Sequence, residues 1–279
     1  MSNCDGSYRY DTLESQVRVG ELNRLYQQAS HMLKIERDFW PSLQIDSDQR
    51  VLDLGCGSGV VTRELARYVH PASVKGLDLS QELIDRGEKA FLALNSDASE
   101  LGRDSNISFQ QGDAYSLPFS DKHFDLVYAR LLFQHLSAPE KALAEILRVL
   151  KPGGRVCILD IDNDWSSMHP QPEAAMALRR AVINQQRLQG GDPTVGRKLG
   201  HYLKASGFSS VKTDIRLVDS EQIGLKRFVE MLSFGSPYQS ADNELEALRE
   251  KAVSEVKEML DNPYAWAGFA LFIVMAQKP

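Results

Sequence analysis

The sequence predicts an α/β protein in which a mostly parallel sheet carries helices on both faces. Short apolar runs typical of buried strands recur over residues 50–161, and segments with helical periodicity separate them. Such alternation is typical of parallel strands joined by crossover helices. A glycine-rich segment follows the first run, and carboxylates follow at later strand ends. Ligands of open α/β sheets bind at the carboxyl ends of the strands, so we expect the site at that edge.

The first strand and the glycine loop after it form the most informative segment. Residues 50–54 are mostly apolar, and Gly55, Gly57 and Gly59 follow at alternate positions before a helix expected over 60–68. Glycine adopts positive φ and lets a ligand approach the backbone closely. A dinucleotide-binding loop needs a further glycine or alanine five positions after its first glycine. Counted from either of the first two glycines, this chain has valine or threonine there.

The remaining strands are expected in an order that completes the sheet. We expect them at residues 73–79, 107–111, 124–129, 155–161, 210–218 and 266–277. Helices are expected at residues 138–150, 173–188 and 196–206, and mostly helical structure over 219–259. Asp78 ends the second strand, 25 residues after Asp53. That is close to the offset of roughly 20 residues at which a carboxylate binds ribose in dinucleotide-binding sheets. Asp113 lies in a Gly-Asp-Ala turn after the third strand.

Together these segments resemble the class I S-adenosylmethionine-dependent methyltransferases. The resemblance rests on the segment Asp53-x-Gly-x-Gly-x-Gly, the acid at Asp78, the Gly-Asp-Ala turn and a Pro-Gly-Gly turn before the fifth strand. It covers residues 50–161 strongly and the rest weakly. It implies a Rossmann-like, seven-stranded, mostly parallel sheet with a helical lid, in which the antiparallel last strand lies between the fifth and the sixth. The alternative is a Rossmann-like domain that binds another nucleotide.

The resemblance also implies how the cofactor is held. Asp78 would accept hydrogen bonds from the ribose diol, and charged acceptors form the stronger bonds; a helix cap is the alternative role. Asp113 would meet the adenine amino group, and the loop backbone would meet the methionine end. Asp53 would orient the glycine loop or bind the amino group. The expected S-adenosylmethionine-binding residues are Asp53, Gly55, Cys56, Gly57, Gly59, Asp78, Leu79, Asp113, Ala114 and Arg130.

A histidine after the fourth strand is the candidate catalytic residue. His135 matches the position of a catalytic histidine in the phosphoethanolamine methyltransferases, where it pairs with an N-terminal tyrosine. Tyr10 is the expected partner here, with Tyr8 and Tyr26 as alternatives. An imidazole with a pKa of about 6.5 suits removal of a proton from a hydroxyl or ammonium group at neutral pH. A packing role in the pocket wall is the alternative for this histidine.

No metal site is expected, although acids cluster after the fifth strand. Asp160, Asp162 and Asp164 have the spacing that opens a calcium loop, but positions 6 and 12 of that loop hold Trp and Gln instead of Gly and Glu. Metal-dependent relatives place an acid after the fourth strand, where this chain has Ala129 and Arg130. We expect Asp160 or Asp162 to face the substrate or to cap the next helix.

We expect two parts in the chain. Residues 1–48 are expected to form an N-terminal helical cap, with a separate helix beginning at Met32. Residues 49–279 are expected to form the methyltransferase domain, with helical insertions at about 163–206 and 219–262 on the carboxyl edge of the sheet. Large apolar side chains in these insertions are expected to wall the acceptor pocket, and these are Trp165, Met168, Phe228, Met231, Phe234 and Tyr238.

Composition restricts the partners that we expect. The net charge of −6 argues against a broad nucleic-acid surface, which would need a basic footprint. No apolar run approaches the ~18 residues of a membrane span. The three cysteines show no pairing or metal spacing, so we expect a reduced, cytoplasmic protein that is a monomer or a homodimer.

The expected function is methyl transfer from S-adenosylmethionine to an O, N or C nucleophile of a small-molecule acceptor. A protein or RNA methyltransferase is one alternative, and the acidic chain argues against it. A non-catalytic S-adenosylmethionine-binding protein is the other, because the residues from Asp53 to Asp113 predict cofactor binding in either case. Turnover alone separates an enzyme from a binding protein.

Overall fold

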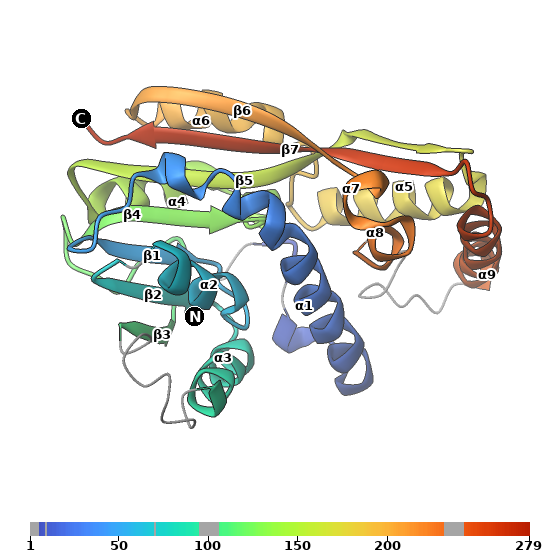
Figure 1. The fold of residues 1–279 in the computed structure, drawn as a ribbon, viewed down its shortest axis with the longest axis horizontal. Helices are drawn as coiled ribbons and strands as arrows, with labels where there is room; N and C mark the ends of the chain where they lie inside the picture. The colour runs from blue at the N-terminus through green and yellow to red at the C-terminus, as the bar shows by residue number, and fades with distance from the viewer. Residues whose placement is uncertain (1–5, 9, 70, 95–105, 232–242) are drawn as a thin grey trace.

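A computed structural model describes residues 6–8, 10–69, 71–94, 106–231 and 243–279. It contains a seven-stranded sheet with the strand order β3-β2-β1-β4-β5-β7-β6 (Figure 1). The strands are β1 (Arg50–Leu54), β2 (Ser73–Asp78), β3 (Ile107–Gln111), β4 (Phe124–Arg130), β5 (Leu150–His169), β6 (Ser209–Asp219) and β7 (Trp266–Gln277). The first five strands are parallel, and β7 pairs antiparallel with both β5 and β6. The predicted fold class is confirmed, including the position of the last strand.

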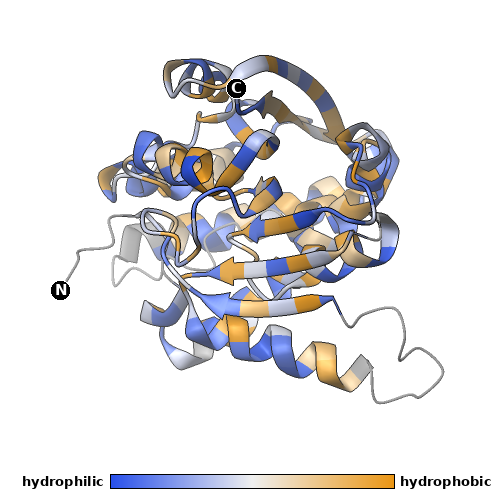
Figure 2. Ribbon diagram, turned by 90° about the vertical axis from the view of Figure 1, so that its left-hand side faces the viewer, coloured by the Kyte–Doolittle hydropathy of each residue, from blue (hydrophilic) through white to orange (hydrophobic). Residues whose placement is uncertain are grey.

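Helices cover both faces of this sheet. They are α1 (Ser15–Arg37), α2 (Val60–Val69), α3 (Gln81–Leu94), α4 (Pro139–Val149), α5 (Glu173–Leu188), α6 (Leu199–Ala205), α7 (Ser220–Ile223), α8 (Leu225–Met231) and α9 (Asn243–Leu260). Short 3₁₀ turns lie at Tyr10–Thr12, Trp40–Leu43, Phe133–His135 and Gly196–Lys198. Each outer helix carries both apolar and polar residues (Figure 2), as expected for helices that bury one face.

The central strand β4 shows why the strands are so apolar. Leu126 and Tyr128 contribute to the core on one face of the sheet, and Val127 and Ala129 contribute to the core on the other. Successive side chains of a strand point to opposite faces. Because helices cover both faces, all four side chains are buried and the strand reads as a continuous apolar run.

The N-terminal region differs from the prediction in one respect. We expected a separate helix to begin at Met32, but α1 is a single helix of 23 residues. No proline interrupts it, and one internal glycine, Gly20, is tolerated within a helix at a modest cost. In Figure 1, α1 lies beyond the arrowhead of β4, so it reaches the carboxyl edge of the sheet.

The fifth strand is longer than predicted. We expected it to end at residue 161 and a helical insertion to start at 163, but β5 continues to His169. After an irregularity between Ile161 and Ser166, it pairs again with the start of β7, up to His169 opposite Trp266. This pairing satisfies backbone groups that a loop would leave to water. The extended β5–β7 ribbon projects past the other strands and lies beside α5 (Figure 1).

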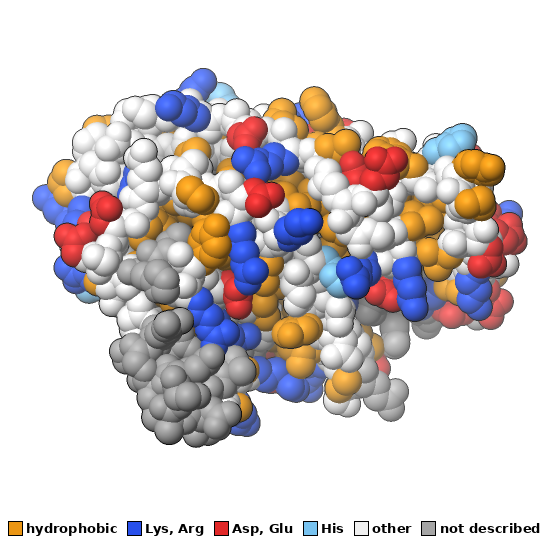
Figure 3. All heavy atoms as spheres, in the orientation of Figure 1, with side chains coloured by type: hydrophobic (Ala, Val, Ile, Leu, Met, Phe, Trp, Pro, Cys, Tyr) orange, Lys and Arg blue, Asp and Glu red, His pale blue; other side chains and the backbone are white. Residues whose placement is uncertain are grey.

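The surface carries both signs of charge. On the face shown in Figure 3, Lys and Arg side chains are interspersed with Asp and Glu side chains. No helix in the described part of the chain combines the length and apolar character that crossing a membrane requires.

Candidate active site

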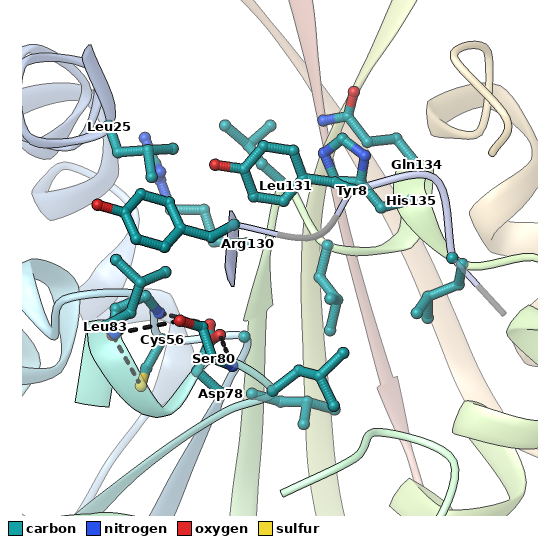
Figure 4. A pocket seen from close by; sticks show the side chains of 18 of the residues that line it. Tyr8, Leu25, Cys56, Asp78, Ser80, Leu83, Arg130, Leu131, Gln134 and His135 are labelled. Atoms are coloured by element: carbon teal, nitrogen blue, oxygen red, sulfur yellow. Dashed lines mark hydrogen bonds between the residues drawn. The ribbon is translucent and has the colours of Figure 1, made fainter. Parts of the chain in front are cut away.

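A cavity of about 540 Å³ opens at the carboxyl edge of the sheet. Its volume lies within the roughly 300–1,000 Å³ typical of small-molecule sites. Loops after β1, β2 and β3 line one end, and the turn after β4 lines the other with α1 and α5 around it. In Figure 4, Cys56 and Asp78 lie at the first end, and Gln134 and His135 at the second. We call these the donor end and the acceptor end.

The glycine loop turns sharply from β1 into α2. Gly55, Gly57 and Gly59 all have positive φ, at 75°, 54° and 70°. The amides of Gly55 and Cys56 donate to the Leu77 carbonyl, which fastens the loop to β2. A Cβ added at Gly57 would meet no atom within 4 Å. The backbone of Gly57 is therefore open to a ligand.

Gly59 has a different role from the one expected. It does not line the cavity, and a Cβ at this position would lie 2.3 Å from the Phe109 ring. The third glycine is thus required for close packing of the loop against the side chain from β3. Its expected contact with the cofactor is wrong, because the loop has already turned away from the cavity there.

Asp78 is fixed at the end of β2 and faces the cavity. Its carboxylate accepts hydrogen bonds from the Gly57 amide at 2.8 Å and the Ser80 amide at 3.0 Å. Burial raises the pKa of this carboxyl. Each carboxylate oxygen has two lone pairs, so acceptor capacity remains for a diol. The helix-cap alternative is wrong, because the Ser80 hydroxyl accepts from the Leu83 amide and caps α3 instead.

The other donor-end acids are also placed by local hydrogen bonds. Asp53 is buried and accepts from the Thr62 hydroxyl at 2.6 Å, which braces α2 against β1. Burial raises the pKa of this carboxyl to about 7. Asp113 accepts from the Tyr115 amide at 2.9 Å. Asp53 and Asp113 line the cavity, as do Leu79 and Ala114.

His135 stands at the acceptor end, in the 3₁₀ turn after β4. Its Nδ1 lies 3.1 Å from the Ser7 hydroxyl, and its ring centroid lies 5.2 Å from that of Tyr8 (Figure 4). Burial, together with the positive charge of Arg24, lowers the pKa of this imidazole to about 4. The ring is therefore neutral at pH 7, with one nitrogen available as an acceptor.

The expected pairing of Tyr10 with His135 is wrong. Tyr10 lines the cavity, but its hydroxyl donates to the Arg18 carbonyl at 3.1 Å. Tyr8, one of the alternatives, lies beside the imidazole, and its hydroxyl donates to Glu21 at 2.8 Å. The two tyrosines differ by two positions in a segment without periodicity, so sequence alone did not distinguish them.

Sequence reasoning missed two buried glutamates of α1. Glu21 binds the Arg24 guanidinium through two hydrogen bonds and accepts from Tyr8. Glu36 pairs with Arg130 and accepts from the Tyr128 hydroxyl at 2.7 Å. Arg130, expected to bind the cofactor, lines the cavity, but its guanidinium forms an ion pair with Glu36. Both glutamates sit on a helix of mixed polarity, and no local pattern marks them as buried.

The acids that we expected after the fifth strand lie within β5 and do not line the cavity. Asp160 accepts from the Gln134 amide at 3.0 Å and so holds the 3₁₀ turn Phe133–His135 that follows β4. Asp162 pairs with Arg197. Neither residue lines the cavity, so both expected roles, facing the substrate and capping the next helix, are wrong. In the described part of the chain, no three His, Cys, Asp or Glu side chains are grouped as a metal would need.

The acceptor end is lined by different side chains from those expected. Of the predicted apolar residues, Met231 lines the cavity. Met168 and Phe228 belong to the core, and Trp165 is 52% exposed and packs on Phe272. Phe234 and Tyr238 lie outside the described residues. The wall is formed instead by one face of α5, comprising Arg179, Val182, Ile183 and Gln186.

Fold and site together define a class. The position of the last strand, the glycine turn and the acid at the end of β2 are those that the resemblance implied, and the family profile described as a methyltransferase domain matches residues 52–158. Residues 52–158 therefore form a methyltransferase domain, and the sheet around them has the Rossmann-like methyltransferase fold.

Several curated relatives match. An uncharacterized methyltransferase, C1B3.06c, of Schizosaccharomyces pombe is 38% identical over 56% of this chain and 55% of its own length. The O-methyltransferase cnsE of Penicillium expansum is 32% identical over 66% of this chain and 60% of its own length. The ubiquinone/menaquinone biosynthesis C-methyltransferase UbiE of Pseudomonas paraeruginosa is 34% identical over 44% of this chain and 46% of its own length. The matches thus span about half the length of these relatives.

Solved structures share the fold. YcgJ of Bacillus subtilis superposes with a TM-score of 0.57 at 22% identity, over 89% of this chain and 98% of that protein. The phosphoethanolamine N-methyltransferase 2 of Haemonchus contortus, solved with S-adenosylhomocysteine, gives a TM-score of 0.57 at 21% identity. That likeness covers 88% of this chain and 52% of that protein.

Proposed function

We propose that this protein transfers a methyl group from S-adenosylmethionine to an O, N or C nucleophile of a small-molecule acceptor. The observation that carries the proposal is the donor end of the cavity, where the half-buried Asp78 carboxylate faces a glycine loop with open backbone at Gly57. A ribose diol needs an acceptor pair, and a methionine end needs close backbone approach. Both requirements fit the residues present.

A small acceptor is favoured by what surrounds the cavity. The helix α1 contributes Leu25, Gln28 and Ala29 to the lining, so it closes part of the cavity wall. We propose that residues 1–48 act as this lid. Names of relatives point the same way, since two of them are an O-methyltransferase and a quinone-biosynthesis C-methyltransferase.

The chain's own residues would act mainly by positioning. S-adenosylmethionine, when bound, supplies a methyl group that the positive sulfur already activates. Orientation of two bound reactants contributes up to about 7–11 kcal/mol in favourable cases. His135 is placed to accept a proton from the acceptor, which contributes about 10²–10⁴-fold where the nucleophile is protonated. Its lowered pKa keeps the imidazole neutral at pH 7 and also makes it a weaker base than an ordinary histidine, which reduces the contribution from proton removal.

Binding of S-adenosylhomocysteine tests the donor end. We expect measurable binding by calorimetry and no binding of NAD. Asp78→Asn removes the charge and should weaken binding by about 1.5–3 kcal/mol, as expected for lost hydrogen bonds to a charged group. Asp85→Asn, an exposed residue of α3, is the matched control. A folded protein that fails to bind S-adenosylhomocysteine would exclude the proposal.

Turnover separates an enzyme from a binding protein. Incubation with methyl-labelled S-adenosylmethionine and small-molecule extracts should transfer label to an extractable product. Label found only on protein or RNA would instead indicate a macromolecular acceptor. Cofactor binding without any transfer would favour a non-catalytic role.

A further inference from the structure

At its acceptor end, the cavity is lined by an arginine whose positive charge no described carboxylate balances. Among the described residues, three arginines line the cavity. Arg24 is paired with the buried Glu21, and Arg130 with the buried Glu36. Arg179 lies within ion-pair distance of no described carboxylate. Its Nη2 donates to the Asn163 side chain at 2.7 Å and to the Ser166 hydroxyl at 2.8 Å, and both of these acceptors are neutral.

A buried guanidinium without a carboxylate partner is energetically unfavourable, so a ligand with a negative charge would stabilise it. Moving a cation away from water is unfavourable unless a negative group compensates it. Burial lowers the pKa of Arg179 to about 10, so the guanidinium is still charged at pH 7. No described carboxylate lies close enough to balance this charge. A ligand with one negative charge would give Arg179 the carboxylate partner that Arg24 and Arg130 already have.

The wall around Arg179 limits the shape of such a ligand. Arg179, Val182, Ile183 and Gln186 recur at helical spacing and form one stripe of α5 that faces the cavity. Gln186 donates to the backbone carbonyl of Gln134, next to His135. Seven residues of helix separate the two ends of the stripe, which is on the order of 10 Å. Two apolar side chains lie between them.

We propose that the acceptor is an elongated amphipathic carboxylic acid. Its carboxylate is bound by Arg179, its apolar body lies against Val182 and Ile183, and its methylated end lies beside His135. The assignment rests on the proposed function, since it describes the acceptor of that same site. One unbalanced positive charge matches a carboxylate better than a phosphate monoester, which carries nearly two negative charges at pH 7.

The donor end does not account for Arg179. The glycine loop follows β1, whereas the partners of Arg179 lie on β5, with β4 between these strands. Two strand spacings separate them, which is roughly 10 Å. The guanidinium is therefore placed for the acceptor and not for the cofactor's own carboxylate.

Calorimetry on the full chain saturated with S-adenosylhomocysteine tests the inference. The probes are 4-hydroxycinnamate and its neutral amide, which share one shape. We expect the wild type to bind the acid roughly ten- to a hundredfold more tightly than the amide, as for hydrogen bonds to a charged group. Arg179→Met should abolish this preference, and Arg179→Lys should retain part of it. Arg180→Met, the exposed neighbour on α5, is the matched control and should leave the preference intact.

Two further readouts separate this role from others. If Arg179 serves the acceptor, Arg179→Met should leave the affinity for S-adenosylhomocysteine unchanged and the thermal midpoint equal or higher, since an uncompensated charge is removed. Lost S-adenosylhomocysteine affinity would assign Arg179 to the cofactor, and a lowered midpoint would assign it to holding β5. Equal binding of acid and amide, or binding of neither, would also overturn the inference. Failure of the wild type to bind S-adenosylhomocysteine would instead overturn the proposed function.

Discussion

The two ends of the cavity are built in different ways. At the donor end, short turns after β2 and β3 hold acids by bonds to backbone two residues away, as the Asp78 carboxylate does with the Ser80 amide and the Asp113 carboxylate with the Tyr115 amide. At the acceptor end, side chains from the N-terminal segment, α1, β5 and α5 meet through long-range pairs such as Tyr8 with Glu21 and Glu36 with Arg130. The donor end is thus built largely from local turns, and the acceptor end from side chains on separate elements.

The largest expected effect comes from the pair that joins α1 to β4. Glu36→Ala leaves Arg130 unpaired and Tyr128 without its acceptor, so we expect a loss of about 3–5 kcal/mol in the free energy of unfolding. Urea denaturation measures it. Asp38→Ala, at an exposed site just after α1, should change stability by less than about 1 kcal/mol. Equal losses in both variants would mean that the buried pair does not hold α1 against β4.

Two glycines of one loop should respond differently. Gly59→Ala forces a Cβ to within 2.3 Å of the Phe109 ring at positive φ, and we expect a loss of about 2–5 kcal/mol of stability. Gly57→Ala meets no atom within 4 Å and should cost only about 1–2 kcal/mol from the left-handed backbone. Its methyl group should instead weaken S-adenosylhomocysteine binding. The opposite assignment, measured by denaturation and calorimetry, would show that the third glycine contacts the ligand.

The free energy of unfolding should fall in acid because of His135. Its pKa is about 4 when folded, against the ordinary value of about 6.5 when unfolded. The unfolded chain therefore binds the proton first, so stability falls as pH is lowered from 6.5 to 4, by at most about 1.4 kcal/mol per pH unit. His135→Gln should flatten this part of the pH profile, whereas the exposed His201→Gln should not. An unchanged profile in the first variant would place the imidazole in contact with bulk water.

The smallest effect is expected at the tyrosine beside the imidazole. Tyr8→Phe keeps the ring against His135 and removes the hydrogen bond to Glu21, which retains Arg24, so we expect a loss of about 1 kcal/mol. S-adenosylhomocysteine affinity should not change. The exposed Tyr26→Phe serves as the control in thermal unfolding. A large drop in cofactor affinity would mean that the two ends of the cavity are not independent.

The same contrast explains what the sequence could predict. The strands, the glycine turn and the acids at Asp78 and Asp113 were predictable because apolar period and turn chemistry are local signals. The pair of Glu36 with Arg130 spans 94 residues, and nothing near either residue marks its partner. The length of β5 was missed for the same reason, since it is set by pairing with β7, a strand almost a hundred residues further along the chain.

In the proposed binding mode, the length of the β5–β7 ribbon limits the length of the acceptor. The ribbon runs on past the point where β4 ends, and α5 lies beside it (Figure 1). Arg179 of α5 donates to Asn163 and Ser166 of this ribbon. Adding two residues to each strand would move that wall outward by about 7 Å and keep every side chain on its face, while adding one would turn each face over. Enzymes of this architecture that differ by even steps in the ribbon would accept chains of different length while binding the same methyl donor.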